Sequence, residues 1–198
     1  MQHIKNAEII TMSTGTFEDL VAIYPDRFDD TRGWFQELYQ ASRLKGYNIS
    51  DVFTQDNISF SKEKHTLRGL HFQNPNGQAK LVTVLQGEIL DVAVDIRINS
   101  LSRGKWMSIV LSAENRTQLY IPAGYAHGFI TLTDDVLLHY KCSEMYTPNS
   151  EHSIAWNDPA LNIQWPTDSP ILSEADSDAP LLSQIDHEIL PKLPGSNL

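Results

Sequence analysis

Three segments of the chain carry side chains that can move protons. His71 lies in HTLRGLHFQ, His127 lies in YIPAGYAHGF, and Tyr140 lies in VLLHYKCS. A histidine with its ordinary pKa of about 6.5 accepts a proton near neutral pH, and a tyrosine with a pKa of about 10 donates one. These residue types suit general acid–base catalysis, provided that the fold brings them to one site.

Arg68 and His71 stand three residues apart in an apolar, strand-like run. Strict alternation along a strand would place them on opposite faces, which argues against a shared site. Gly69 lies between them, and glycine within a strand often marks a bulge that re-aims a side chain. The alternative is that His71 is a hydrogen-bonded structural histidine.

Tyr140 is expected to point into an apolar interior. Alternation along its strand groups it on one face with Val136, Leu138 and Cys142. A buried hydroxyl needs a hydrogen-bond partner, so a plain core tyrosine is the alternative to a catalytic one. His139 and Lys141 fall on the opposite face, and we expect them to be solvated.

The two histidine segments are similar to the motifs of cupin barrels, whose metal sites use a His-x-His pair and a downstream Glu. Here the first motif reads His71-Phe72-Gln73. With only His71 and His127 as obvious ligands, a three-ligand metal site is poorly supported. The sequence therefore predicts neither a metal nor another cofactor.

The elements that must position these residues read as β-strands. In EILDVAVDI, Leu90, Val92, Val94 and Ile96 alternate with polar or small residues, a period of two that marks a strand with one apolar face. KLVTVL precedes this run, and WMSIVL, QLYIPAG, HGFITLT and VLLHYKCS follow it at roughly ten-residue spacing. Such spacing predicts an antiparallel sandwich or barrel.

The N-terminal and C-terminal parts of the chain are expected to differ in structure from the barrel strands. FEDLVAIY and the stretch around TRGWFQELY are expected to pair as strands, and QASRLKGY to form a short helix. From residue 147 the chain is rich in Pro, Asn, Asp and Trp, which predicts loops over the barrel. Apolar residues then recur at helical spacing and predict a short C-terminal helix through Leu181, Leu182, Ile185 and Ile189.

The bulk composition narrows the class of protein. A length of 198 residues suits one domain, with a barrel core over about 50–146 and a C-terminal wrap over 147–198. The net charge of -10 argues against a nucleic-acid partner. One cysteine, a polar N-terminus and the lack of a long apolar run predict a cytoplasmic protein with no membrane partner.

Seven segments in order resemble the dTDP-4-dehydrorhamnose 3,5-epimerase family over about residues 20–182. They are TRGWFQELY, QDNISFSKEKHTLRGLHFQ, AKLVTVLQGEILDVAVDIR, LSAENRTQLYIPAGYAHGF, YKCSEMYTP, WNDPALNIQWP and LSEADSDAP. The resemblance implies an all-β, antiparallel cupin-like jelly-roll barrel with short helices at its periphery and C-terminus. It also implies a metal-free enzyme and a homodimer with shared active sites.

The resemblance also implies roles for individual residues. His71 matches the base, Asp176 the carboxylate that orients it, Tyr140 the acid, and Lys80 the lysine beside the substrate ketone. The positions that match nucleotide-sugar contacts are Arg32, Phe35, Glu37, Gln55, Asn57, Arg68, His127, Tyr146 and Glu151. The segment carrying Phe35 is often donated by the neighbouring subunit in this family.

The implied reaction inverts carbons 3 and 5 of dTDP-4-dehydro-6-deoxy-D-glucose and feeds the synthesis of L-rhamnose and of lipopolysaccharide O-antigen. Two departures from the family pattern are Met145, where a tyrosine is common, and Ala175, where a basic residue is common. The first leaves open an enzyme that inverts one carbon only. A relative that acts on a GDP- or CDP-linked sugar is a further alternative within the class. The competing functions are a ketoisomerase, a metal-dependent oxygenase and a non-catalytic sugar-binding module.

Overall fold

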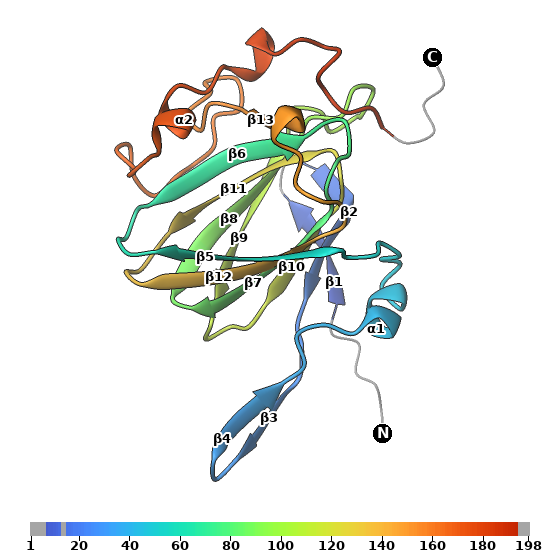
Figure 1. Ribbon diagram of the computed structural model, residues 1–198, viewed down its shortest axis with the longest axis vertical. Coiled ribbons are helices and arrows are strands. Elements are labelled where there is room, and N and C mark those ends of the chain that lie inside the picture. The colour runs from blue at the N-terminus through green and yellow to red at the C-terminus, as the bar shows by residue number, and fades with distance from the viewer. Residues whose placement is uncertain (1–6, 13–14, 194–198) are drawn as a thin grey trace.

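Two antiparallel β-sheets face each other in the computed structural model, which describes residues 7–12 and 15–193 (Figure 1). The larger sheet contains, in spatial order, β1 (Ala7–Met12), β2 (Gly15–Ile23), β10 (Gln118–Ile121), β7 (Lys80–Gln86), β12 (Val136–Cys142) and β5 (Gln55–Ser61). The smaller contains β13 (Glu151–Ser153), β6 (Leu67–Gln73), β11 (Tyr125–Thr131), β8 (Glu88–Asp95) and β9 (Trp106–Ser112). The predicted antiparallel all-β class is confirmed.

The space between the sheets is filled by apolar side chains from both. Val82 and Leu138 of the larger sheet pack in one cluster with Ala93, Met107 and Phe129 of the smaller sheet. All five are at most 5% exposed. Because side chains alternate along a strand, any residue that shares a face with these five points into the same interior.

A second apolar layer lies on the outer face of the smaller sheet. Val92, Val94 and Ile96 of the β8 region pack there against residues of the C-terminal segment, including Ile154 and Leu161. The predicted apolar face of this strand is therefore confirmed, but it faces the C-terminal segment. The opposite, more polar face of β8 points into the barrel.

The C-terminal segment wraps over the smaller sheet, as predicted from its composition (Figure 1). It contains a 3-10 turn at Pro148–Ser150, the short helix α2 (Glu174–Ser177) and a second 3-10 turn at Leu182–Gln184. The predicted C-terminal amphipathic helix is wrong. Backbone at Ile185 is extended, and Leu182, Ile185 and Ile189 reach the apolar layer without helical structure, because packing outweighs the weak propensity of so short a segment.

The N-terminal region corrects a second prediction. β2 pairs with β1 and β10, whereas β4 (Gly33–Gln36) pairs with β3 (Arg27–Asp30) to form a separate hairpin. FEDLVAIY and TRGWFQELY therefore do not pair with each other. The hairpin, which we call the arm, projects away from the two sheets (Figure 1).

The predicted short helix is confirmed as α1 (Ala41–Lys45), which packs through Leu44 against the outer face of the larger sheet. The expectation that the outer side chains of β12 are solvated is wrong. His139 Nε2 and Lys141 Nζ both contact Asp56, at 2.9 and 2.7 Å, and only 18% and 13% of these two side chains is exposed. None of the helices in the described residues is long and apolar enough to cross a membrane.

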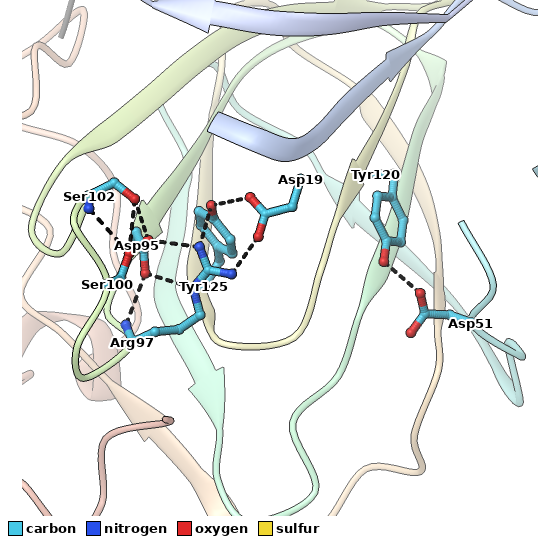
Figure 2. A network of polar contacts seen from close by, with 8 residues as sticks. All are labelled: Asp19, Asp51, Asp95, Arg97, Ser100, Ser102, Tyr120 and Tyr125. Atoms are coloured by element: carbon cyan, nitrogen blue, oxygen red, sulfur yellow. Dashed lines mark hydrogen bonds and ion pairs between the residues drawn. The ribbon is translucent and has the colours of Figure 1, made fainter. Parts of the chain in front are cut away.

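A network of ion pairs connects β2 to the end of β8 in the smaller sheet. Figure 2 shows the guanidinium of Arg97 between the carboxylates of Asp95 and Asp19. Arg97 Nη2 also donates to the hydroxyl of Tyr125 at 2.9 Å, and that hydroxyl donates to Asp19 at 2.6 Å. Burial raises the pKa of the Asp95 carboxyl, but hydrogen bonds from Arg97, Ser100 and Ser102 outweigh it, so the pKa lies below its usual range.

Replacing Arg97 with methionine is expected to destabilise the fold by about 3–5 kcal/mol at pH 7, because Asp95 would remain buried without a counter-charge. The pKa of Asp95 is lower in the folded state than in the unfolded state. The stability that Arg97 adds to the fold is therefore fully present above a pH of about 4, and it is lost as the pH falls through the pKa of the folded state. Urea unfolding of wild type and Arg97→Met at several pH values measures both effects. An equal midpoint at pH 7 would contradict the assignment.

Candidate active site

A bulge in β6 turns the side chains of Arg68 and His71 toward the barrel interior. His71 lies opposite His127 of β11, but Arg68 lies opposite Phe129, so three steps along β6 match two along β11. Phe129 belongs to the interior cluster, and residues directly opposite each other in an antiparallel pair share a face. Arg68 and His71 therefore face inward together, as the bulge prediction requires.

Gly69 makes the bulge possible. Its φ is +104°, a conformation that L side chains rarely adopt. A Cβ at this position would lie 2.6 Å from the carbonyl oxygen of His127 and 2.8 Å from Cα of Gly128. Only glycine lets β6 and β11 approach this closely.

His71 is bound by a buried carboxylate. Its Nε2 lies 2.6 Å from Oδ1 of Asp176, and the exposed fractions of the two side chains are 33% and 4%. Asp176 also accepts hydrogen bonds from the hydroxyl of Ser173 at 2.8 Å and from the backbone N–H of Gly69 at 3.3 Å. Burial raises the pKa of Asp176, but these hydrogen bonds outweigh it and lower that pKa, so the group is a carboxylate at neutral pH.

A carboxylate that accepts a hydrogen bond from Nε2 determines which nitrogen of the neutral ring is protonated. The proton lies on Nε2, and the lone pair is left on Nδ1. Within the described part of the chain, Nδ1 of His71 makes no hydrogen bond to protein. In this tautomer Nδ1 of His71 is able to accept a proton.

A second histidine–aspartate pair lies directly beside the first. Nε2 of His127 is 2.9 and 3.0 Å from the two carboxylate oxygens of Asp91 on β8, and Asp91 is fully buried. The alternation in β8 predicts that Asp91 shares a face with Ala93, which lies in the interior cluster. Asp91 is a site residue that sequence reasoning missed. The signal was a carboxylate on the polar face of a strand, which suggests a buried partner.

Tyr140 lies on the opposite sheet. It pairs with Val82 of β7 and Asn57 of β5, and it packs against the interior cluster. Burial raises the pKa of the Tyr140 hydroxyl, with further contributions from Cys142 and Glu151, so the phenol keeps its proton well above neutral pH. The prediction that Tyr140 points into the interior is confirmed.

Lys80 enters the same space from the edge of β7. It lies opposite Cys142, two residues beyond Tyr140 on β12. Burial lowers the pKa of the Lys80 ammonium, and Cys142, Asp91 and Glu151 only partly oppose this. Within the described residues Lys80 Nζ forms no ion pair or hydrogen bond, so its charge is available to a ligand.

Of these side chains, His71 and Lys80 open into one pocket. Its walls include His71, Gln73, Lys80, Tyr125, Tyr146 and Glu151. Asp176 lies behind His71, and Tyr146 donates a hydrogen bond of 2.6 Å to Glu151 at the rim. The pocket thus combines an imidazole base, an ammonium group and a carboxylate, with the phenol of Tyr140 on the facing sheet.

Three further predicted contact residues also lie at the open edge of the two sheets. Arg68 reaches from β6 to β5, where its Nε donates to Ser61 at 3.3 Å and its Nη2 to the carbonyl of Phe60 at 3.2 Å. It meets no carboxylate in the described residues. Gln55 donates to Asn57 at 2.9 Å, so these two amides are engaged with each other.

The remaining three predicted contact residues do not reach the pocket of their own chain. Arg32 and Phe35 lie on the arm, with Arg32 bound to Asp30 and Phe35 66% exposed. Glu37 follows the arm and binds Arg43 at 2.8 Å. Among residues 7–12 and 15–193, no three His, Cys, Asp or Glu side chains gather in a group that could hold a metal ion.

The chain is similar to known proteins over most of its length. The model of the family described as dTDP-4-dehydrorhamnose 3,5-epimerase matches residues 14–184. The dTDP-4-dehydrorhamnose 3,5-epimerase of Salmonella typhimurium is 48% identical over 171 residues, which cover 84% of this chain and 92% of that relative.

Two solved structures show the same fold. The 3,5-epimerase of Legionella pneumophila in complex with dTDP-4-keto-L-rhamnose is 45% identical with a TM-score of 0.88, and the match covers 94% of this chain and 98% of that chain. A 3'-monoepimerase from Streptomyces bikiniensis in complex with dTDP-quinovose is 35% identical with a TM-score of 0.83, covering 92% of both chains. These likenesses confirm the predicted cupin-like jelly roll.

The protonation of His71 is directly measurable. In the wild type, neutral His71 is expected to carry its proton on Nε2, because that nitrogen donates to Asp176. Asp176→Asn places an amide there that can donate instead, which shifts the proton to Nδ1. Long-range ¹H–¹⁵N correlation spectra of ¹⁵N-labelled protein report the tautomer, and loss of the signals in His71→Gln assigns them. A proton on Nδ1 in the wild type would contradict the structure.

Proposed function

The chain belongs to the dTDP-4-dehydrorhamnose 3,5-epimerase family, and we propose that it inverts carbons 3 and 5 of dTDP-4-dehydro-6-deoxy-D-glucose to give dTDP-4-dehydro-L-rhamnose. One observation carries this proposal. A carboxylate-bound imidazole and a partly buried phenol lie on facing sheets, and the imidazole shares a pocket with an ammonium group that has no ion-pair partner among the described residues. The protein is accordingly an isomerase.

The first step removes a proton from a carbon next to the ketone. Nδ1 of His71 takes the proton from carbon 3 or carbon 5, and the electron pair of the broken C–H bond moves onto the ketone oxygen at carbon 4. The resulting imidazolium is stabilised by Asp176, which is already charged and hydrogen-bonded in the resting protein. Such a preset carboxylate stabilises the charge as it forms, without reorganisation.

The enolate oxygen formed in this step needs a positive charge nearby. Lys80 supplies it, since its ammonium points into the pocket without a carboxylate partner. A preorganised donor of this kind contributes about 3 kcal/mol to transition-state stabilisation. Because burial lowers the pKa of Lys80, the group is also poised to lose its effect at alkaline pH.

Inversion requires the second proton to arrive from the opposite face of the sugar ring. Tyr140 donates it from the larger sheet, and the raised pKa of its hydroxyl keeps that proton available. The same base and acid then act on the other carbon. Proton exchange with water between the two rounds returns the imidazole and the phenol to their starting states.

The nucleotide diphosphate is proposed to lie along the open edge of the pocket. Arg68 has no carboxylate partner among the described residues, and its forked donors match phosphate oxygens. His127 lies opposite His71 on β11, and Gln55 and Asn57 lie on the edge strand β5. Tyr146, 50% exposed at the rim, presents an aromatic face on which a nucleobase can stack.

We further propose a homodimer in which each arm completes the site of its partner. The arm exposes Phe28, Trp34 and Phe35, each more than 60% accessible, and Arg32 at its tip. Ile58 and Phe60 on β5 expose a second apolar patch, at 66% and 53%. A second copy of the chain would bury both, and it would bring Arg32 and Phe35 to a pocket that lacks them.

We propose that the protein acts in the cytoplasm, where nucleotide sugars are made. The single cysteine, Cys142, is free, which fits a reducing compartment. The product would supply L-rhamnose for surface polysaccharide such as lipopolysaccharide O-antigen.

The reaction is tested by turnover in deuterated water. Wild type is expected to place one deuterium on carbon 3 and one on carbon 5, seen by NMR and mass spectrometry of the product. One deuterium only would assign a single-carbon epimerase, the activity named for the Streptomyces bikiniensis neighbour. No incorporation would contradict the proposed function.

Two variants separate the base from the acid. His71→Asn is expected to abolish exchange, and Tyr140→Phe to slow inversion by about 10²–10⁴-fold. Tyr140→Phe should still allow exchange with retention, because a deuterated His71 returns its deuteron to the original face. Tyr24→Phe, a partly exposed tyrosine outside the pocket, is the matched control and should behave as wild type.

The shared site is tested by mixing two inactive variants. Arg32→Ala lacks the arm contact and His71→Asn lacks the base. Random exchange of subunits gives heterodimers with one intact site each, so an equal mixture should recover about a quarter of wild-type activity. If each chain builds its site alone, Arg32→Ala will be active by itself, because Arg32 does not reach the pocket of its own chain, and the exchange of arms is wrong.

A further inference from the structure

Gln73 is a buried side chain that grips the backbone of a neighbouring segment. It lies two residues beyond His71 on β6 and is 8% exposed. Its Nε2 donates to the carbonyls of Asn76 and Met145, the latter at 3.2 Å, and its Oε1 accepts from the backbone N–H of Thr147 at 2.9 Å. One carboxamide therefore satisfies both a donor and an acceptor of the segment 145–147.

The segment 145–147 belongs to neither sheet, so its backbone groups need side-chain partners. Gln55 on β5 provides another one, since its Oε1 accepts from the backbone N–H of Tyr146 at 2.8 Å. β5 and β6 lie in different sheets. Two glutamine side chains, one from each sheet, thus hold the segment across the edge of the pocket.

This grip determines where the Tyr146 side chain lies. Tyr146 is flanked on both sides by residues that Gln73 holds, and its hydroxyl donates to Glu151. Glu151 is in turn the residue paired with Gln73 between β13 and β6. Gln73 therefore connects to both members of the Tyr146–Glu151 pair at the rim, through a hydrogen-bonded clamp and through strand pairing.

We propose that Gln73 is a positioning residue that sets the nucleotide end of the site by fixing Tyr146. This inference rests on the proposed function, in which the rim receives the nucleotide. Gln73 also occupies the position at which the cupin His-x-His motif has its second ligand. In this chain the side chain at that position lies at the edge of the pocket, where its amide forms hydrogen bonds with backbone groups.

A positioning role predicts a specific kinetic pattern. Gln73→Met keeps the side-chain length and removes the polar grip, so Tyr146 should sample several positions. Binding of the nucleotide should weaken about tenfold, seen as a higher KM and a higher Kd for dTDP alone by calorimetry. kcat should stay within about twofold, because His71, Lys80 and Tyr140 are not held by this amide.

A double-mutant cycle tests whether Gln73 acts through Tyr146. In a Tyr146→Ala background, Gln73→Met should change the Kd for dTDP by less than about twofold, because the group that it positions is absent. Independent, additive effects would overturn the inference, as would an unchanged Kd in the single variant or a fall in kcat at constant KM.

Gln73→Glu is the conservative variant, and it keeps the acceptor for Thr147 while losing the donor to Met145. It should show an intermediate Kd and remains informative should Gln73→Met fold poorly. Gln164→Met is the matched control, because that glutamine is exposed and, among the described residues, its side chain bonds only to Asn162. The dTDP titration does not require turnover, so a wild type that binds dTDP but incorporates no deuterium would refute the proposed function without deciding the role of Gln73.

Discussion

The close approach of β6 to β11 at Gly69 is the constraint on which the rest of the site depends. The bulge there brings Arg68 and His71 to the same face, whereas a regular strand would separate them. It also directs the N–H of Gly69 to Asp176, the carboxylate that orients His71. One backbone feature therefore places the base, aims a cation and binds the carboxylate that supports the base.

The charged side chains of the barrel fall into two groups, paired carboxylates and unpaired cations. Three buried carboxylates each have a cationic or imidazole partner: Asp176 has His71, Asp91 has His127, and Asp95 has Arg97. The two cations nearest the pocket, Lys80 and Arg68, form no ion pair in the described residues. Since an uncompensated buried charge is costly, leaving Lys80 without a partner makes sense where a developing enolate supplies the missing charge, and the exposed Arg68 can meet an anionic ligand.

The arm, in contrast to the barrel, exposes its apolar side chains. It carries three exposed aromatic side chains and stands outside both sheets, and its residues Arg32 and Phe35 do not line the pocket of their own chain. The proposed dimer gives these residues a function by closing a pocket that its own chain leaves open. The clamp of Gln55 and Gln73 acts at the same edge, and the nucleotide end of the site would thus be assembled from loops held by side chains rather than from sheet alone.

The sequence by itself determined the local structure of the barrel and the identity of the chemistry. Apolar runs bounded by turn residues located β7 to β12, with period-two alternation in β8 and β12, because these patterns are local properties. The resemblance to a known family, carried by the ordered motifs, pointed to His71, Lys80, Tyr140 and Asp176. The sequence also suggested a bulge at Gly69, since glycine weakens a regular strand and is favoured where the backbone bends or approaches a neighbour closely.

Only the tertiary structure decided which partners meet. Asp91 with His127, Gln73 with the segment 145–147, and the separate hairpin of the arm all join residues whose pairing leaves no periodic signal in the chain. The failed C-terminal helix has the same cause. Leu182, Ile185 and Ile189 are apolar at helical spacing, but the surface against which they pack determines their backbone, and that surface exists only once the sheets have formed.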